Sequence, residues 1–418
     1  MPDLCVVIVD PYSSGAMLAD VLQSRRIKCV AVDSSPTLPS AMKSKFASEH
    51  FVEVIQHRGY LKPTLRAVRQ HCPTHILAGF ESGVELADWL ATQLALPGND
   101  PRYHASRRDK FSMTELVAAR GLRIARQFCS DQIISILEWI HANLDWPVIV
   151  KPCRSVASDL VFRCLNQAEV RYACEQILSN CNILGERNSS VLIQEYLDGT
   201  EYAVDVVSLS GQKVNTAIWQ YHRPTDTNDF TCYDAMSLLP YAGARQDALK
   251  QFAFSVMEAL GIEFGPAHCE IMWVQDEPVF IEVGVRLSAG SNATLSRSCG
   301  GISQLDKTIQ AIVDPDQFLA TLDDVPSLKQ FAANVFLHPP CPGTLVQTHY
   351  LEQIEALTTF HSLSVARTPG TELGRVAGLV TLVHPDPAAV QQDIHTVRAL
   401  VRAGLFQIKP TSTRSSTP

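Results

Sequence analysis

No apolar run in the 418-residue sequence approaches the roughly 20 residues that a membrane-spanning helix needs. The first ten residues, MPDLCVVIVD, contain no basic segment, and their apolar stretch ends at Asp10. This pattern predicts a buried strand rather than a signal peptide. The twelve cysteines are scattered singly, without a C-x-x-C pair, which argues against a zinc site and a disulfide framework. We therefore expect reduced thiols, a cytoplasmic location and no membrane partner.

Clusters of positive charge are also missing. The net charge is −8, and Lys, Arg, Asp and Glu are spread along the chain, whereas nucleic-acid binders usually carry a basic stripe. We therefore expect no nucleic-acid partner. The turn from Asp10 to Gly15 lacks G-x-G-x-x-G spacing, and G-x-S-x-G does not occur. These absences argue against an NAD enzyme and leave no serine-protease pattern.

Short apolar strands alternate with helical patterns over the first hundred residues. This alternation predicts an α/β fold, with a Rossmann-like parallel sheet at the N-terminus. The expected strands are Leu4–Val9, Cys29–Val32, Phe51–Ile55 and His75–Ala78, and the expected helices are Gly15–Ser24, Leu61–Gln70 and Val84–Leu94.

The turn-forming run from Leu96 to Pro101 marks a domain boundary. Later segments mix helices with hairpins, which predicts α+β central domains. We expect an N-terminal domain over 1–105, a small domain over 106–188, a large domain with a C-terminal extension over 189–410, and a disordered Ser/Thr/Pro-rich tail over 411–418.

Two predicted strands, His268–Val274 and Pro278–Val283, are joined by a short turn. Alternate residues of a strand share a face, so His268 and Glu270 point one way, and Glu282 and Arg286 can face them. Two neighbouring carboxylates repel unless a cation lies between them, and Mg²⁺ is usually held by carboxylates and phosphates. Arg286 could grip a phosphate. The alternative is a solvent-facing hairpin with mixed charges.

Two lysines form the second candidate group. Lys110 opens a predicted helix, and Lys151 ends the predicted strand Trp146–Val150. A lysine at the end of a buried strand costs desolvation unless it meets an anion. The loop that follows offers the hydroxyls of Ser155 and Ser158, which suit a phosphate-covering loop. Either lysine could instead extend its ammonium to solvent.

The segment Glu195-Tyr196-Leu197 offers the backbone of a strand edge to an adenine, and Glu201 could accept from ribose hydroxyls. An exposed strand and turn is the alternative interpretation. His222 lies after a strand and is a candidate substrate contact.

Further substrate contacts are expected near two turns. Glu81, at a strand end, could bind a substrate amino group, and the backbone of Ser288, Gly290 and Ser291 could bind a carboxylate or carbonyl. Turn formation is the alternative role for each.

Together these segments resemble the ATP-grasp superfamily: Lys110, Lys151-Pro with its serine loop, Glu195-Tyr-Leu with Glu201, His268-x-Glu270, and Glu282 with Arg286. The resemblance implies that the two lysines and the loop with Ser155 and Ser158 contact ATP phosphates. It also implies adenine at Glu195–Leu197, ribose at Glu201, Mg²⁺ (with Mn²⁺ as an alternative) at Glu270 and Glu282, and catalytic roles for Arg286 and His268.

Within that superfamily the chain is similar to bacterial L-amino-acid ligases, with the tabtoxin type as the suggested member. The similar stretches are Val9–Gly15, Ala105–Lys110 and Thr368-Pro-Gly370. The resemblance implies ATP-dependent joining of two amino acids through an acyl phosphate, with release of ADP and phosphate. Small-molecule amino acids would be the partners, and a homodimer is an open alternative.

Three residues depart from the family pattern. Gly284 stands where the family usually has a metal-binding Asn, and Ala157 and Leu160 stand where loop glycines are common. Another ATP-grasp ligase or carboxylase, and an ATP-binding module without turnover, therefore stay open as alternatives.

Overall fold

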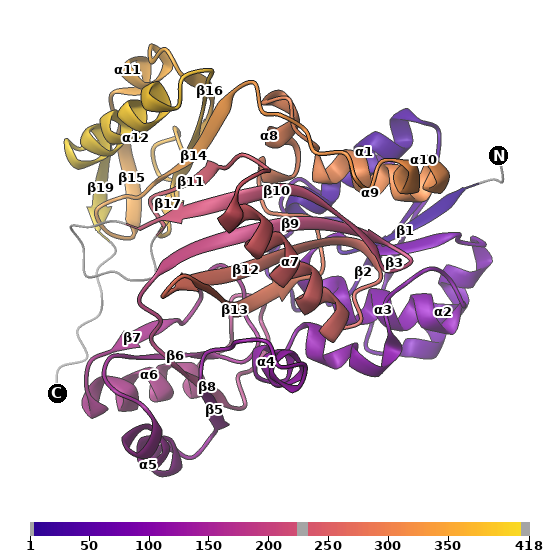
Figure 1. Ribbon diagram of the computed structural model, residues 1–418, viewed down its shortest axis with the longest axis horizontal. Coiled ribbons are helices and arrows are strands. Elements are labelled where there is room, and N and C mark those ends of the chain that lie inside the picture. Colours follow the sequence, from indigo (N-terminus) through magenta and orange to yellow (C-terminus); the bar gives the residue numbers. More distant parts are fainter. Residues whose placement is uncertain (1–3, 224–232, 411–418) are drawn as a thin grey trace. The chain divides into compact units, whose positions relative to one another are not determined.

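A computed structural model describes residues 4–223 and 233–410 (Figure 1). The predicted tail over 411–418 lies outside these residues. The chain divides into two compact units, and the division falls within strand β10. Unit 1 comprises Met1–Ile218, Tyr241–Leu295 and Ile302–Pro326, and unit 2 comprises Trp219–Pro240, Ser296–Gly301 and Ser327–Pro418. The domain boundaries expected at residues 105 and 188 stay a prediction.

The N-terminal part of unit 1 is a four-stranded parallel sheet in the order β3-β2-β1-β4, as predicted. Its central strand β1 is buried along its whole length, which explains the continuous apolar run. The elements are β1 (Cys5–Val9), α1 (Ala16–Ser24), β2 (Lys28–Asp33), β3 (Glu53–Gln56), α2 (Leu61–Gln70), β4 (His75–Ala78) and α3 (Val84–Gln93).

The carboxyl ends of β1 and β4 meet at one edge of this sheet. A Cβ on Gly15 would overlap the carbonyl of Gly79, so the turns after the two strands can touch only because both residues are glycines. Short 3-10 turns follow both strands, and Glu81 opens the second. The 3-10 turns of the chain are Ser13–Gly15, Ser40–Met42, Ser48–His50, Glu81–Gly83, Pro101–Tyr103 and Ala105–Arg107.

A small antiparallel sheet in the order β5-β8-β6-β7 follows, with its own apolar core. Its elements are α4 (Lys110–Ala119), β5 (Gln127–Ser130), α5 (Ile133–Asn143), β6 (Val148–Pro152), β7 (Phe162–Cys164), α6 (Gln167–Ser179) and β8 (Val191–Glu195). The sequence did not indicate β5, because its four residues are all half-buried and show no alternation.

The larger sheet of unit 1 has the order β13-β12-β9-β10, and α7 and α9 contact β9 and β12. Figure 1 shows α7 lying across β9 and β12. The elements are β9 (Thr200–Leu209), β10 (Gln212–His222), α7 (Ala244–Ala259), β12 (Phe264–Val274), β13 (Glu277–Gly284), α8 (Asn292–Ser298), α9 (Gln304–Val313) and α10 (Pro315–Ala320).

Unit 2 continues from the last residues of β10 with strands in the order β11-β14-β18-β16, beside a second sheet β17-β15-β19. Helix α12 contacts β14 and β18. The elements are β11 (Ala235–Leu238), β14 (Phe331–Leu337), β15 (Gly343–Thr348), α11 (Leu351–Glu355), β16 (Phe360–Val365), β17 (Glu372–Leu373), β18 (Gly378–His384), α12 (Pro387–Arg402) and β19 (Phe406–Pro410).

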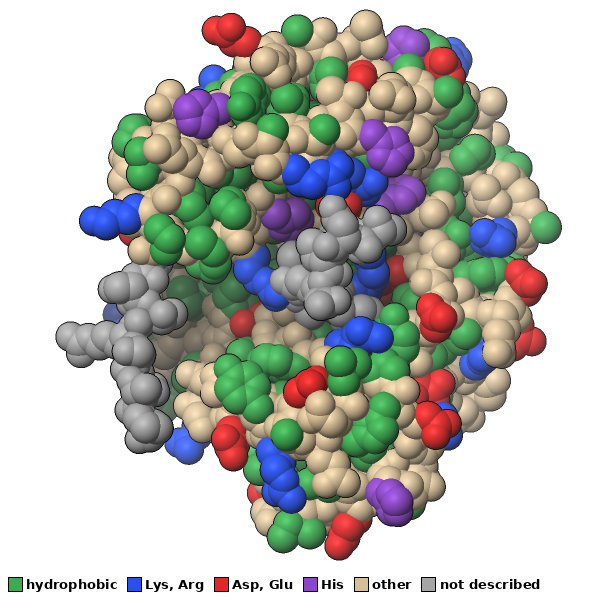
Figure 2. All heavy atoms as spheres, turned by 90° about the vertical axis from the view of Figure 1, so that its left-hand side faces the viewer, with side chains coloured by type: hydrophobic (Ala, Val, Ile, Leu, Met, Phe, Trp, Pro, Cys, Tyr) green, Lys and Arg blue, Asp and Glu red, His purple; other side chains and the backbone are tan. Residues whose placement is uncertain are grey.

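The described surface mixes charges of both signs. Figure 2 shows acidic, basic and hydrophobic side chains interspersed over the face that it displays. Within residues 4–223 and 233–410, no helix combines the length and the apolar character that crossing a bilayer requires.

Candidate active site

The β12–β13 hairpin brings the two predicted metal-binding acids together. In its register Glu270 lies opposite Glu282, and His268 lies opposite Gly284. The side chains of Glu270 and Glu282 remain 19% and 27% exposed, so both carboxylates can still be reached. The predicted pairing of these two carboxylates is therefore confirmed.

Lys110 closes one side of this acid pair. Its Nζ lies 3.0 Å from Glu282 Oε2 and donates to the carbonyl of Ser155 at 2.7 Å. Burial alone would lower the pKa of Lys110, but the carboxylates of Glu282 and Glu81 outweigh it and hold this pKa above its usual value. The lysine therefore stays charged next to Glu282 and reaches the loop after β6.

Lys151 is buried at the end of β6, with only 6% of its surface exposed. Among the described residues, no hydrogen bond or ion pair to its ammonium is found. Burial lowers its pKa to about 8, although the more distant carboxylate of Glu282 works in the opposite direction. This ammonium is therefore the group in the site that most needs an anion.

His268 lies between two acids. Its Nδ1 is 2.6 Å from Asp205 Oδ1, and its Nε2 is 3.4 Å from Glu270 Oε1. Burial opposes a charge on the ring, yet Asp205 and Glu270 together raise its pKa to about 9. Burial would raise the pKa of Glu270, but the hydrogen bond and charge of His268, together with the charges of Arg286 and Lys110, lower it below its usual value. Glu270 is thus held ionised, as a metal ligand must be.

Arg286 follows the end of β13 and pairs with Glu81, its Nε lying 3.2 Å from Glu81 Oε2. A Cβ built on Gly284 would be 3.2 Å from both the Arg286 guanidinium and this carboxylate. The Arg286–Glu81 pair therefore packs over the position where the sequence resemblance expects Asn. The structure thus brings Glu81, from the turn after β4, next to Arg286, and its contact with a substrate amino group stays a prediction.

The loop after β6 is held by its own acid. Ser155 Oγ donates to Asp159 Oδ2 at 2.7 Å, and the N–H of Ile183 donates to the same oxygen at 2.8 Å. Ala157, Ser158 and Leu160 have φ of 56°, 54° and 53°. The loop thus keeps a backbone that favours glycine although its residues have side chains.

The predicted nucleotide edge joins the end of β8, in the small antiparallel sheet, to the start of β9, in the larger sheet of unit 1. The Glu195 carboxylate lies 2.5 Å from Arg126 Nε, the Tyr196 ring stacks under Arg163, and Leu197 is buried. Glu201 is 4% exposed and pairs with Met272 in the β9–β12 ladder. The Glu195 N–H donates to the carbonyl of Arg126. The backbone groups available to an adenine are therefore those that follow this N–H in the chain. Nucleotide contacts here stay a prediction.

The predicted substrate contacts after Arg286 divide into two kinds. The N–H of Ser288 donates to Gln304 Oε1 at 2.8 Å, so this N–H already has a partner within the protein. Gly290 has φ of 62° with open space around its Cα, and the Ser291 carbonyl accepts from Thr294 in the first turn of α8. Substrate contacts at all three residues stay predictions.

His222 belongs to unit 2, where its Nε2 lies 2.9 Å from Ser237 Oγ. Burial, and then the charge of Arg398, lower the pKa of this histidine. A substrate role for it stays a prediction.

Asp205 is the residue that the sequence interpretation missed. It is fully buried in β9 and is the acid that holds His268. Its signal was a lone acidic residue within the apolar strand Tyr202–Leu209, because an acid in a buried strand requires a partner.

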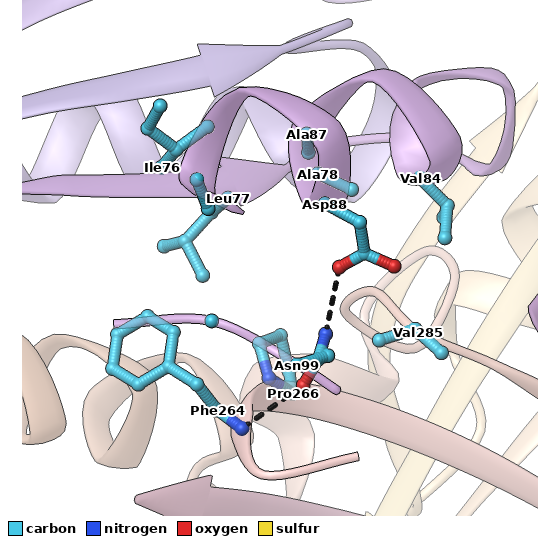
Figure 3. A pocket seen from close by; sticks show the side chains of 12 residues that line it. Ile76, Leu77, Ala78, Val84, Ala87, Asp88, Asn99, Phe264, Pro266 and Val285 are labelled. Atoms are coloured by element: carbon cyan, nitrogen blue, oxygen red, sulfur yellow. Dashed lines mark hydrogen bonds between the residues drawn. The ribbon is translucent and has the colours of Figure 1, made fainter. Parts of the chain in front are cut away.

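Apolar side chains dominate the lining of a cavity elsewhere in unit 1, between β4, α3 and β12 (Figure 3). Its polar groups are engaged with one another: Asn99 donates to Asp88 at 3.0 Å, and buried Arg107 lies 2.7 Å from the same carboxylate. The lining contains none of the acids of the hairpin, so we assign this cavity to packing.

The residues of the site fit a divalent cation that also binds phosphates. Within the described ranges, no group of three or more His, Cys, Asp and Glu side chains is arranged to hold a metal by itself. Two facing carboxylates do suit Mg²⁺, which takes one or two carboxylates and completes its shell with waters and substrate phosphates.

Residues 144–294 match the ATP-grasp domain family. The chain belongs to the ATP-grasp family of ATP-dependent ligases, whose members use ATP and Mg²⁺. It is 30% identical over 405 residues to dapdiamide A synthase of Enterobacter agglomerans, covering 94% of this chain and 95% of that protein. The predicted ATP-grasp fold is therefore confirmed, and the tabtoxin type stays a prediction.

Solved structures show the same fold. The L-amino acid ligase from Bacillus licheniformis has a TM-score of 0.74 at 15% identity, covering 98% of this chain and 99% of that one. The carboxyaminoimidazole ribonucleotide synthase from Aspergillus clavatus, solved with ATP, has a TM-score of 0.70 at 16% identity, covering 96% and 100%.

Proposed function

We propose that this protein joins two amino acids into a dipeptide, using ATP to activate one carboxylate as an acyl phosphate. The observation that carries the proposal is the largely buried side chain of Lys151, whose ammonium contacts no anion among the described residues. It belongs to the same site as Lys110 and the acids Glu270 and Glu282. Phosphates would supply the missing anion, and the likeness to dapdiamide A synthase supports the substrate class.

The nucleotide would lie along the residues that the sequence predicted. Lys110 and Lys151 would contact its phosphates, and the loop with Ser155 and Ser158 would fold over them. Adenine would lie against the backbone of residues 195–197, and Glu201 would accept from the ribose. The burial of Glu201 and its position on the same face of β9 as Asp205 support a role for Glu201 in binding the ribose.

Glu270 and Glu282 would hold Mg²⁺, or Mn²⁺ in its place. When bound, the cation supplies charge stabilisation for the transferring phosphoryl group. Gly284 offers no side-chain oxygen, so these two acids are the proposed ligands.

Arg286 and Glu81 would exchange partners when substrate binds. Their ion pair satisfies both charges without substrate. A bound amino acid brings an ammonium that Glu81 can accept, and its carboxylate can take over the guanidinium of Arg286. Arg286 would then stabilise the acyl phosphate, while His268 acts on Glu270.

The chemistry needs two transfers. A carboxylate oxygen of the first amino acid attacks the γ-phosphorus of ATP, and ADP leaves. The amine of the second amino acid then attacks the activated carbonyl, and phosphate leaves. The closed loop after β6 would keep water from the intermediate. We place the reaction in the cytoplasm, which agrees with the free thiols of the described cysteines, and a homodimer remains part of the proposal.

The test is ADP formation across a matrix of amino-acid pairs, with products identified by mass spectrometry. We expect ADP release that depends on both amino acids and matches dipeptide formation one to one. ATP binding without amine-dependent ADP formation would contradict the proposal and indicate a binding module. Turnover with bicarbonate in place of an amino acid would indicate a carboxylase.

A further inference from the structure

Asp205 has a contact that the reaction itself does not explain. Its carboxylate is fully buried and lies 2.6 Å from His268 Nδ1. The carboxylate oxygen accepts in this contact, and the Nδ1–H of His268 donates to it. This fixes which ring nitrogen faces Asp205 and turns Nε2 towards Glu270 Oε1, 3.4 Å away.

The position opposite His268 in the β12–β13 ladder is a glycine. The ladder partner of His268 is Gly284, which has no side chain, and the space above Gly284 is taken by Arg286 and Glu81. The contact with Asp205 of β9 therefore helps to set the orientation of the imidazole and, through it, that of the Glu270 carboxylate.

We propose that Asp205 is a positioning residue that holds His268 and thereby fixes the Glu270 carboxylate in the orientation that binds the divalent cation. This inference rests on the proposed assignment of Glu270 and Glu282 to that cation. In this chain the third family position is Gly284, so the orientation of the remaining acids carries more of the metal affinity. Partners that orient a ligand in this way typically contribute about 10- to 100-fold.

The test is Mn²⁺ binding in the presence of ADP, measured by electron paramagnetic resonance. Asp205→Asn should weaken Mn²⁺ binding at least about tenfold, while metal-free ADP binding stays unchanged. His268→Asn should give a similar loss, and the double variant should lose no more than His268→Asn alone, because the two residues act in series. The control Ser208→Ala changes a buried polar residue of the same strand that donates to Ile262 instead, and should stay within about twofold.

Additive losses in the double variant, or wild-type Mn²⁺ affinity in Asp205→Asn, would overturn the positioning role. If Asp205→Asn does not fold, wild-type Mn²⁺ affinity in His268→Asn overturns it equally. The variant Glu270→Gln tests the assignment of Glu270 as a metal ligand separately from the positioning role of Asp205. An unchanged Mn²⁺ affinity in Glu270→Gln would show that Glu270 is not a metal ligand, and the positioning role of Asp205 would then fall as well.

A second, independent observation concerns two thiols next to the phosphate-binding lysines. Cys129 Sγ of β5 lies 3.3 Å from Cys153 Sγ, just after β6. Their hydrogen bond lowers the pKa of Cys129 to about 7. The carbonyl of Cys153 accepts from the N–H of Lys110 at 2.9 Å, and Lys151 is two residues earlier, so a shift of Cys153 would reach both lysines.

We propose that hydrogen peroxide oxidises this pair to a disulfide that weakens nucleotide binding. The Cys129 thiolate would attack one peroxide oxygen and give a sulfenic acid and, after proton uptake, water; the Cys153 thiol would then displace a second water as the S–S bond forms. The sulfurs would have to approach to about 2.05 Å, which moves the chain between the two lysines.

Peptide mapping and ADP affinity before and after peroxide test this switch. We expect a Cys129–Cys153 peptide, an ADP affinity reduced at least about fivefold, and recovery with dithiothreitol. Cys129→Ser should remove the response, and Cys72→Ser, at an exposed thiol of the N-terminal sheet region, should retain it. A disulfide without loss of affinity, or no disulfide at all, would overturn the proposal.

Discussion

In the β12–β13 hairpin and just after it, each charged side chain of the site contacts an opposite charge, whereas the ammonium of Lys151 contacts none among the described residues. Glu282 lies next to Lys110, and Arg286 lies next to Glu81. The hairpin is therefore organised before any ligand arrives. Lys151 instead keeps a charge without a counter-ion, which the phosphates of a nucleotide can neutralise, and the loop after it contains three residues at positive φ.

The first prediction tests the β12–β13 hairpin. Glu282→Gln should lower the rate of ADP formation by roughly a thousandfold, because it removes both a proposed metal ligand and the partner of Lys110. Initial rates with saturating ATP measure this loss. The matched control is Glu277→Gln at the exposed start of β13, which should retain full activity. Full activity in Glu282→Gln would show that the hairpin is not the reaction centre.

The second prediction contrasts the two lysines. Lys151→Met should weaken ATP binding about 100-fold, yet raise the free energy of unfolding by on the order of 1 kcal/mol, because it removes a buried charge without a partner. Lys110→Met should also weaken ATP binding but should destabilise the fold, since it leaves Glu282 unpaired. Calorimetry and urea unfolding measure both. If Lys151→Met and Lys110→Met changed the free energy of unfolding equally and in the same direction, the proposed difference between the two lysines would be wrong.

Strand register explains how much the sequence could predict. The alternation of side chains along a strand predicted that His268 and Glu270 share a face, and the short turn predicted that Glu282 lies opposite Glu270. Both predictions depend only on local geometry. The pairing of Glu81 with Arg286 and of Asp205 with His268 joins residues far apart in the chain. Sequence could name Glu81 as a strand-end residue, but its ion-pair partner depends on how the sheets pack. Asp205 gave only the weak signal of an acid in an apolar strand.

The third prediction uses the low pKa of Lys151, about 8 in the free protein. Below pH 8 the ammonium is charged and ready for phosphate. Above pH 8 the free protein loses this proton, so phosphate binding must take it up again, and ADP affinity should fall by up to about tenfold per pH unit. The pKa of Lys110 is raised, so it stays charged there. Isothermal titration calorimetry between pH 7 and pH 9.5 in two buffers measures affinity and proton uptake. A flat profile would contradict the buried, unpaired state of Lys151.

The fourth and smallest effect concerns the loop backbone. Ala157→Gly and Leu160→Gly should each stabilise the protein by about 0.5–1 kcal/mol, because a side chain at positive φ costs more than the added chain entropy of glycine. Gly284→Ala should act in the opposite direction on the organised hairpin, since its Cβ crowds Arg286 and Glu81. Thermal unfolding measures all three. Destabilisation by both loop glycines would contradict the described backbone.

The most direct measurement for the central claim is the fate of oxygen from the first amino acid. We would supply an amino acid with an ¹⁸O-labelled carboxylate, ATP and the second amino acid, and analyse the released phosphate by mass spectrometry. An acyl phosphate predicts one ¹⁸O atom in phosphate for each dipeptide formed. Phosphate without label, alongside ADP formation, would contradict activation of the carboxylate by this site.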